Sequence, residues 1–124
     1  MALYPSDRSK IIEVFGRLQH EVHGLAKEKG WHDESRSVPE ALCLVHSELS
    51  EALEEYRQSR NDEDLKRVVE DDSGKPEGFS VELGDAIIRI LDLAGALGLD
   101  LAGAVLQKHT FNMIRPHRHG NKRC

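Results

Sequence analysis

The feature that most constrains this chain is a three- and four-residue spacing of apolar side chains, which recurs along four separate stretches. Such spacing places the apolar side chains on one face of an α-helix, whereas the alternation typical of strands is almost absent. The pattern predicts helices over about 7–29, from 38 to beyond 56, over 80–97 and over 101–115. We therefore expect an all-α fold, a four-helix bundle-like domain.

Residues that end or begin helices stand at the borders of these stretches. Ser6 or Asp7 is expected to cap the first helix, and the segment 37–40 forms a capping box before the second. Gly98 should end the third helix, and Asp100 should cap the fourth. Residues 60–78 are polar and acidic, so we expect a loop there with a short helical turn near 65–69, serving as a mobile lid or partner contact.

Composition limits what kind of protein this is. At 124 residues, with 39% hydrophobic and 31% charged residues, the chain is expected to form a single globular domain over 1–124. The two cysteines, Cys43 and Cys124, make no disulfide framework. The first residues lack a signal peptide's pattern, and no apolar run is long enough to span a membrane. A cytoplasmic protein with no membrane partner is expected.

The charge is unevenly distributed. The net charge of −5 argues against a nucleic-acid partner. From Lys108 onward, however, the chain has five basic residues and no acidic ones, which makes a basic C-terminal tail over about 115–124. This end is either simply solvated or contacts a polyanion.

Two pairs of acids stand three residues apart on the predicted second and third helices. They are Glu48, Glu51, Glu82 and Asp85. Residues three apart share one face of a helix, so each pair presents two carboxylates to one place. On the largely apolar third helix, the second pair opens a single polar stripe that continues through Arg89 and Asp92. Carboxylates on a buried helix must pair with cations, become protonated or bind a metal.

The donor type indicates which metal. Carboxylate oxygens alone suit hard ions, so Mg²⁺ is expected, with Mn²⁺ as a possible substitute. A di-iron bundle would require Glu-x-x-His motifs, and neither acid pair has a histidine at that position. A solvated acidic face is the alternative, and it is the preferred interpretation for Glu54 and Glu55. We expect no zinc site from His109, His117 and His119.

Four ordered segments make the chain resemble the MazG-like nucleotide pyrophosphohydrolases, a group of all-α NTP pyrophosphatases. The segments are KGWHD (29–33), HSELSEALEEYR (46–57), GKPEGFSVELGD (74–85) and the stretch from Lys108 through Asn112 and Arg115 to Gly120. The resemblance implies magnesium-dependent hydrolysis of a (deoxy)nucleoside triphosphate to the monophosphate and pyrophosphate. It implies that the two acid pairs hold the metal at the catalytic site. It also implies phosphate contacts by Lys108, Asn112 and Arg115.

Two further residues are candidates for binding the nucleotide base. Trp31, the sole tryptophan, is either a plug at the end of the bundle or a stacking platform, as the resemblance suggests. His23 is either an exposed histidine or a base or sugar contact. His32 stands where relatives often have an aromatic residue.

Two other functions remain open at this point. One is a non-catalytic helical interaction module, because apolar helix faces can also bury a partner's helices. The other is hydrolysis of phosphoribosyl-ATP. Because the third helix is apolar over most of its circumference, we also expect a homo-oligomer, either a dimer or a tetramer.

Overall fold

The computed structural model describes residues 3–116, and within them the chain is mostly helical, as the sequence predicts. Its elements are α1 (Pro5–Glu28), α2 (Val38–Gln58), α3 (Asp62–Lys66), β1 (Val69–Glu70), β2 (Pro76–Glu77), α4 (Phe79–Leu97) and α5 (Leu101–Ile114). The all-α expectation is confirmed, and four of the five described helices are those predicted.

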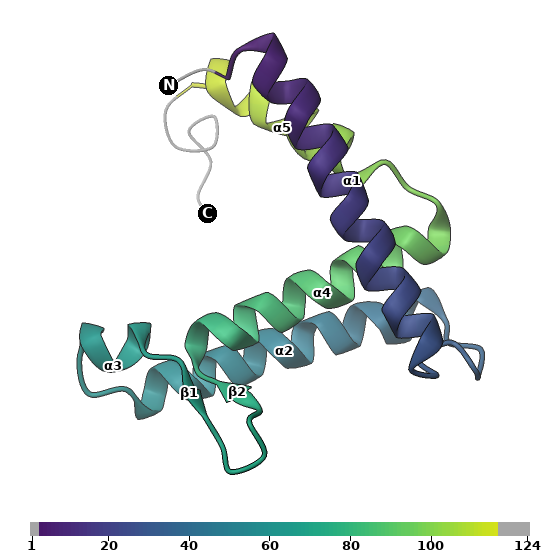
Figure 1. Ribbon diagram of the computed structural model, residues 1–124. Coiled ribbons are helices and arrows are strands. Elements are labelled where there is room, and N and C mark those ends of the chain that lie inside the picture. Colours follow the sequence, from purple (N-terminus) through teal and green to yellow (C-terminus); the bar gives the residue numbers. More distant parts are fainter. Residues whose placement is uncertain (1–2, 117–124) are drawn as a thin grey trace.

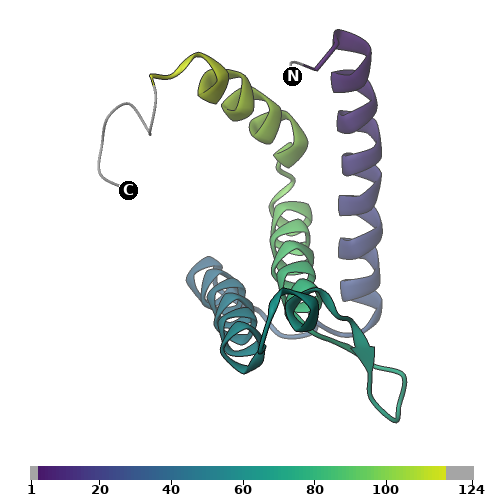
Figure 2. The same cartoon turned by 90° about the vertical axis from the view of Figure 1, so that its left-hand side faces the viewer.

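The long helices form two antiparallel pairs that meet at one end of the molecule. Helix α2 lies beside α4, and α5 returns along α1 (Figure 1). Helix α1 also packs against α4, so α4 is the element that joins the two pairs. Figure 2 shows open space between α5 and α2. The four helices of a single chain are therefore an open arrangement and do not close into a bundle.

Most predicted helix ends are confirmed. The Ser37 hydroxyl accepts a hydrogen bond from the Glu40 backbone N–H at 3.3 Å, and Asp100 accepts one from the Gly103 N–H at 2.9 Å. Gly98 ends α4 in the left-handed region with φ +66°. The prediction for the first helix was wrong, because Tyr4 is the capping residue and Asp7 accepts its backbone N–H at 3.2 Å. Pro5 fits the first turn, so the helix begins earlier than the apolar pattern indicates.

Helix α4 supplies more of the small core than any other described helix. Leu91 is its most deeply buried apolar side chain, flanked by Ala86 and Ala94. Val45 and Ala52 from α2 and Ala26 from α1 are also buried. The small size of most of these residues allows the helices to approach closely. Larger apolar side chains in the predicted stripes, including Leu18 and Leu49, remain exposed in the single chain.

The segment between α2 and α4 is more ordered than a loop. Its helical turn lies at 62–66, slightly before the predicted position, and a small antiparallel hairpin follows, in which Val69 pairs with Glu77. Asp71 organises the turn of the hairpin, since its Oδ1 accepts the backbone N–H groups of Ser73 and Lys75 at 2.8 and 3.0 Å. Two-residue strands are too short to leave an alternating pattern, so the sequence did not reveal them.

None of the described helices combines the length and apolar character needed to cross a membrane. Of the predicted basic tail, only Arg115 and Pro116 belong to the described residues, and 117–124, including His117 and His119, lie outside them.

Candidate functional site

Three of the four predicted acids come together between α2 and α4. Glu48, Glu82 and Asp85 each place a carboxylate oxygen within 4.8 Å of the others. They meet because α2 and α4 run antiparallel, which sets the middle of α2 opposite the first turns of α4 (Figure 1). Glu51 is exposed and does not join this group of three, although it lies near enough for its charge to act on Glu82.

The carboxylates disfavour one another's ionisation. Partial burial, together with the charges of Asp85, Glu48 and Glu51, raises the pKa of Glu82 above its ordinary value of 4.5. Burial and the charge of Glu48 likewise raise the pKa of Asp85 above 3.8. Both ionised forms are therefore less favourable here than in water, which is the condition under which a bound cation is stabilising.

Cations of the chain offset only part of this charge. The Arg89 Nε donates a hydrogen bond to Glu48 Oε1 at 2.6 Å, and both side chains are largely buried. Arg89 and Lys75 act in the opposite direction on the pKa of Asp85, yet that pKa still rises. Two positive charges thus face four carboxylates when Glu51 is included. An all-oxygen donor set with excess negative charge fits a hard divalent cation such as Mg²⁺.

Gly84 lies between Glu82 and Asp85, where the absence of a side chain leaves room for close approach by another helix or a ligand. Within the described chain, a Cβ built at Gly84 would meet no atom within 4 Å. No other element of the same chain therefore requires a glycine at this position.

The indole ring of Trp31 lies next to the guanidinium group of Arg89. The Arg89 guanidinium carbon is 5.5 Å from the centroid of the indole ring, which is a cation–π distance. Arg89 thus links Glu48 and Trp31. Beside it is a pocket whose polar lining is His32, Arg36, Arg89 and Asp92 and whose apolar lining includes Leu44 and Leu97.

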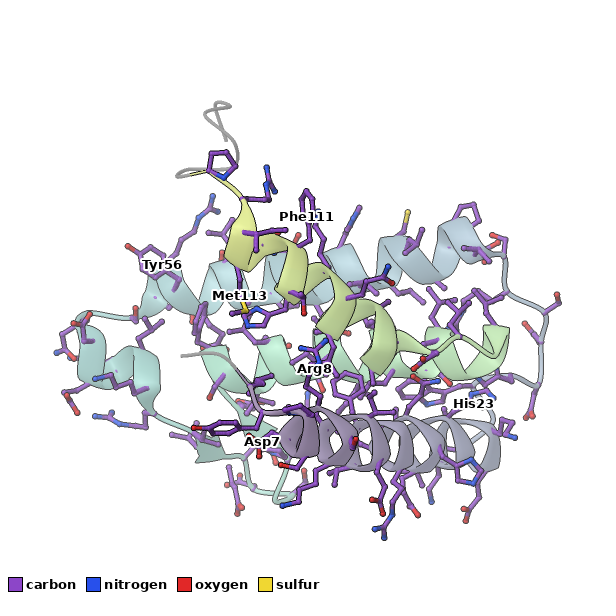
Figure 3. The ribbon with its side chains drawn as sticks, turned by 90° about the horizontal axis from the view of Figure 1, so that it is seen from above. Asp7, Arg8, His23, Tyr56, Phe111 and Met113 are labelled. Carbon is purple, nitrogen blue, oxygen red and sulfur yellow. The ribbon has the colours of Figure 1, made fainter. Side chains whose placement is uncertain are left out.

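A second cluster was missed in the sequence. The Asp92 carboxylate accepts hydrogen bonds from His23 Nδ1 and from His32 Nε2, each 2.8 Å from Oδ1. Asp92 stood out as the last residue of the polar stripe, but nothing in the chain's local pattern indicated its partners. His23 lies on the side of α1 that faces α4 (Figure 3) and is only 17% exposed. The interpretation of His23 as an ordinary exposed histidine was therefore wrong.

The predicted phosphate contacts lie on the other pair of helices. Lys108 and Arg115 approach the ring of Phe111 at 4.8 and 5.7 Å, on α5 and just after its end. Among residues 3–116, no ion pair or hydrogen bond joins Lys108, Asn112 or Arg115 to the three clustered acids. In the single chain, α5 packs along α1 and away from α2 (Figure 2).

Comparison with known proteins adds no relative: no family model, curated protein or solved structure matches the chain.

Proposed function

We propose that this chain is a magnesium-dependent nucleoside triphosphate pyrophosphohydrolase of the MazG-like type. The observation that supports this most directly is the convergence of Glu48, Glu82 and Asp85, with raised pKa values for the latter two. Groups whose environment disfavours their own charged form cluster at functional sites. The four MazG-like segments, in their order along the sequence, indicate that the substrate is a nucleotide.

Each acid has a proposed role in this site. Glu48, Glu82 and Asp85 would hold Mg²⁺, and Glu51 would join them through a change of side-chain rotamer or through a water molecule. A bound divalent cation offsets the charge on phosphate oxygens and promotes in-line attack at phosphorus. One of these acids, or Glu55 on the next turn of α2, would accept the proton of the attacking water.

The rest of the nucleotide would extend along the polar stripe of α4. Arg89 lies between the carboxylates and the pocket, and Trp31 offers an aromatic surface beside it. We propose that the base binds near Trp31 and His23. Phosphate binding by Lys108, Asn112 and Arg115 then requires movement of α5 or a second copy of the chain, because the single chain keeps these residues apart from the acids.

A nucleotide panel tests this proposal. Purified protein with Mg²⁺ should release pyrophosphate and the monophosphate from at least one (deoxy)nucleoside triphosphate, and chelation should abolish the reaction. Replacing Glu82 by Gln should lower kcat/KM by at least about a hundredfold, since ligands of a catalytic metal contribute several kcal/mol to the rate. Glu54→Gln is the matched control, because Glu54 is an exposed acid of α2 outside the cluster.

The same panel separates the other functions. Turnover of phosphoribosyl-ATP with none of the triphosphates would assign the related reaction to this site. No turnover of any nucleotide, with Mg²⁺ or Mn²⁺, would contradict catalysis and favour a helical interaction module.

A further inference from the structure

His23, His32 and Asp92 form a compact set of metal-ligating side chains at the far end of the polar stripe. His23 comes from α1, His32 from the connection before α2, and Asp92 from α4. Each offers one ligand atom, and the three atoms lie within 4.8 Å of one another. We propose that these residues bind a divalent transition-metal ion of the Zn²⁺ class, at a site separate from the carboxylate cluster.

The spacing of the three atoms is close to that of a metal site. His23 Nδ1 and His32 Nε2 both lie 2.8 Å from Asp92 Oδ1. Around a metal with bonds of about 2.0–2.1 Å, such atoms are separated by about 2.9–3.4 Å, depending on coordination geometry. Each of the two distances to Asp92 Oδ1 therefore needs to lengthen by only a few tenths of an ångström. Each neutral imidazole would then carry its proton on its other nitrogen, leaving a lone pair for the metal.

The donor types separate this site from the first. Imidazole nitrogens suit zinc and other first-row transition metals, whereas the oxygen-only cluster suits magnesium. Two histidines and one carboxylate also make three protein ligands, which leaves a coordination position open. Asp92 and His32 also line the pocket beside Arg89, through which water or a ligand can reach these side chains.

The surrounding fold holds the ligands in place. The Asp92 side chain is 8% exposed, so its charge depends on the groups around it for stabilisation. The two imidazole rings stand edge-to-face with centroids 5.0 Å apart. Gly95, one turn after Asp92 on α4, allows His23 to approach, because a Cβ at Gly95 would lie 2.6 Å from the His23 Cβ. A bound ion would link α1, the α1–α2 connection and α4.

Metal binding without any nucleotide tests this inference. Chelator-treated protein should bind one Zn²⁺ per chain at this site in calorimetric titration, and excess Mg²⁺ should not displace it. The His32→Ala variant should weaken this binding by about 10- to 100-fold or more, the range for disturbing a metal's ligand environment. His20→Ala is the matched control, because His20 is an exposed histidine of α1 outside the cluster.

Two further variants distinguish loss of the Zn²⁺ site from loss of the Mg²⁺ site and from unfolding. Glu82→Gln should retain this Zn²⁺ site while losing Mg²⁺ binding, so failure of one site does not imply failure of the other. His23→Gln, compared by circular dichroism with the parent, separates loss of a ligand from loss of the fold. Zn²⁺ binding of unchanged stoichiometry and affinity in a folded His23→Gln, His32→Ala double variant would overturn the proposal.

Discussion

At the scale of single residues, Glu82 and Asp85 carry an energetic cost in the absence of metal. Their raised pKa values mean that the folded chain holds their protons more tightly than the unfolded chain does. Without a divalent cation, the contribution of these two groups to stability is therefore larger at acidic pH and decreases as the pH rises from their ordinary values, 4.5 and 3.8, through the raised ones. A divalent cation that binds the ionised carboxylates offsets the free-energy cost of ionising them in the folded chain.

Neutralising one acid should therefore stabilise the metal-free protein. We expect Glu82→Gln to raise the free energy of unfolding by about 0.5–2 kcal/mol at neutral pH, the usual gain when an unfavourable charge at a partly exposed position is removed. Mg²⁺ should raise the melting temperature of the parent at neutral pH, much less below pH 4, and not at all in Glu82→Gln. Thermal melts with and without Mg²⁺ measure all three effects. A metal-free Glu82→Gln variant less stable than its parent would contradict mutual repulsion among these acids.

At the scale of elements, the crossing of α1 and α4 depends on Gly95. A methyl group at this position would overlap the Cβ and ring of His23, so the two packed helices would have to move apart. Gly95→Ala should therefore destabilise the protein by about 1–3 kcal/mol, as overpacked cores do, despite the higher helix propensity of alanine.

Gly16 provides the matched control within α1. A Cβ there would meet no atom within 4 Å, so Gly16→Ala should be neutral or stabilise the protein by up to about 1 kcal/mol. Urea denaturation of both variants measures the contrast. Equal effects of the two substitutions would show that α1 and α4 do not cross as closely as described.

At the scale of the whole molecule, the chain exposes too much surface for a compact monomer. Its accessible surface is 9784 Å², whereas about 6,700 Å² is expected for a compact monomer of 14.0 kDa. Large apolar side chains lie along the exposed faces of α2 and α4. They include Leu42, Leu49, Leu53, Leu83, Ile87 and Ile90. Phe111 and Met113 of α5, labelled in Figure 3, are half exposed as well.

We therefore predict a homodimer or homotetramer that completes the open bundle. The excess surface per chain is well above the roughly 800 Å² that each partner buries in a standard interface, which favours an extensive, obligate one. Light scattering at micromolar concentration should give two or four times 14.0 kDa. Leu53→Glu should dissociate the assembly, whereas Ser47→Glu, at an exposed polar position of α2, should not. A monomeric parent protein would refute the prediction.

The sequence by itself determined where the helices lie and which residues form the polar stripe of α4. These follow from local spacing, because residues three and four apart on a helix share a face whatever surrounds them. Glu82, Asp85, Arg89 and Asp92 could be placed together for this reason. The caps at Ser37 and Asp100 are equally local, so they too were predicted correctly.

Only the tertiary structure decided which distant residues meet. The antiparallel register of α2 and α4 brings Glu48, and not Glu51, into the cluster of three acids. The crossing of α1 over α4 brings His23 and His32 to Asp92 across more than fifty residues of sequence. Such contacts depend on how helices approach and cross, which is set by the packing of side chains from both partners. A periodic pattern within one helix contains no information about that relation.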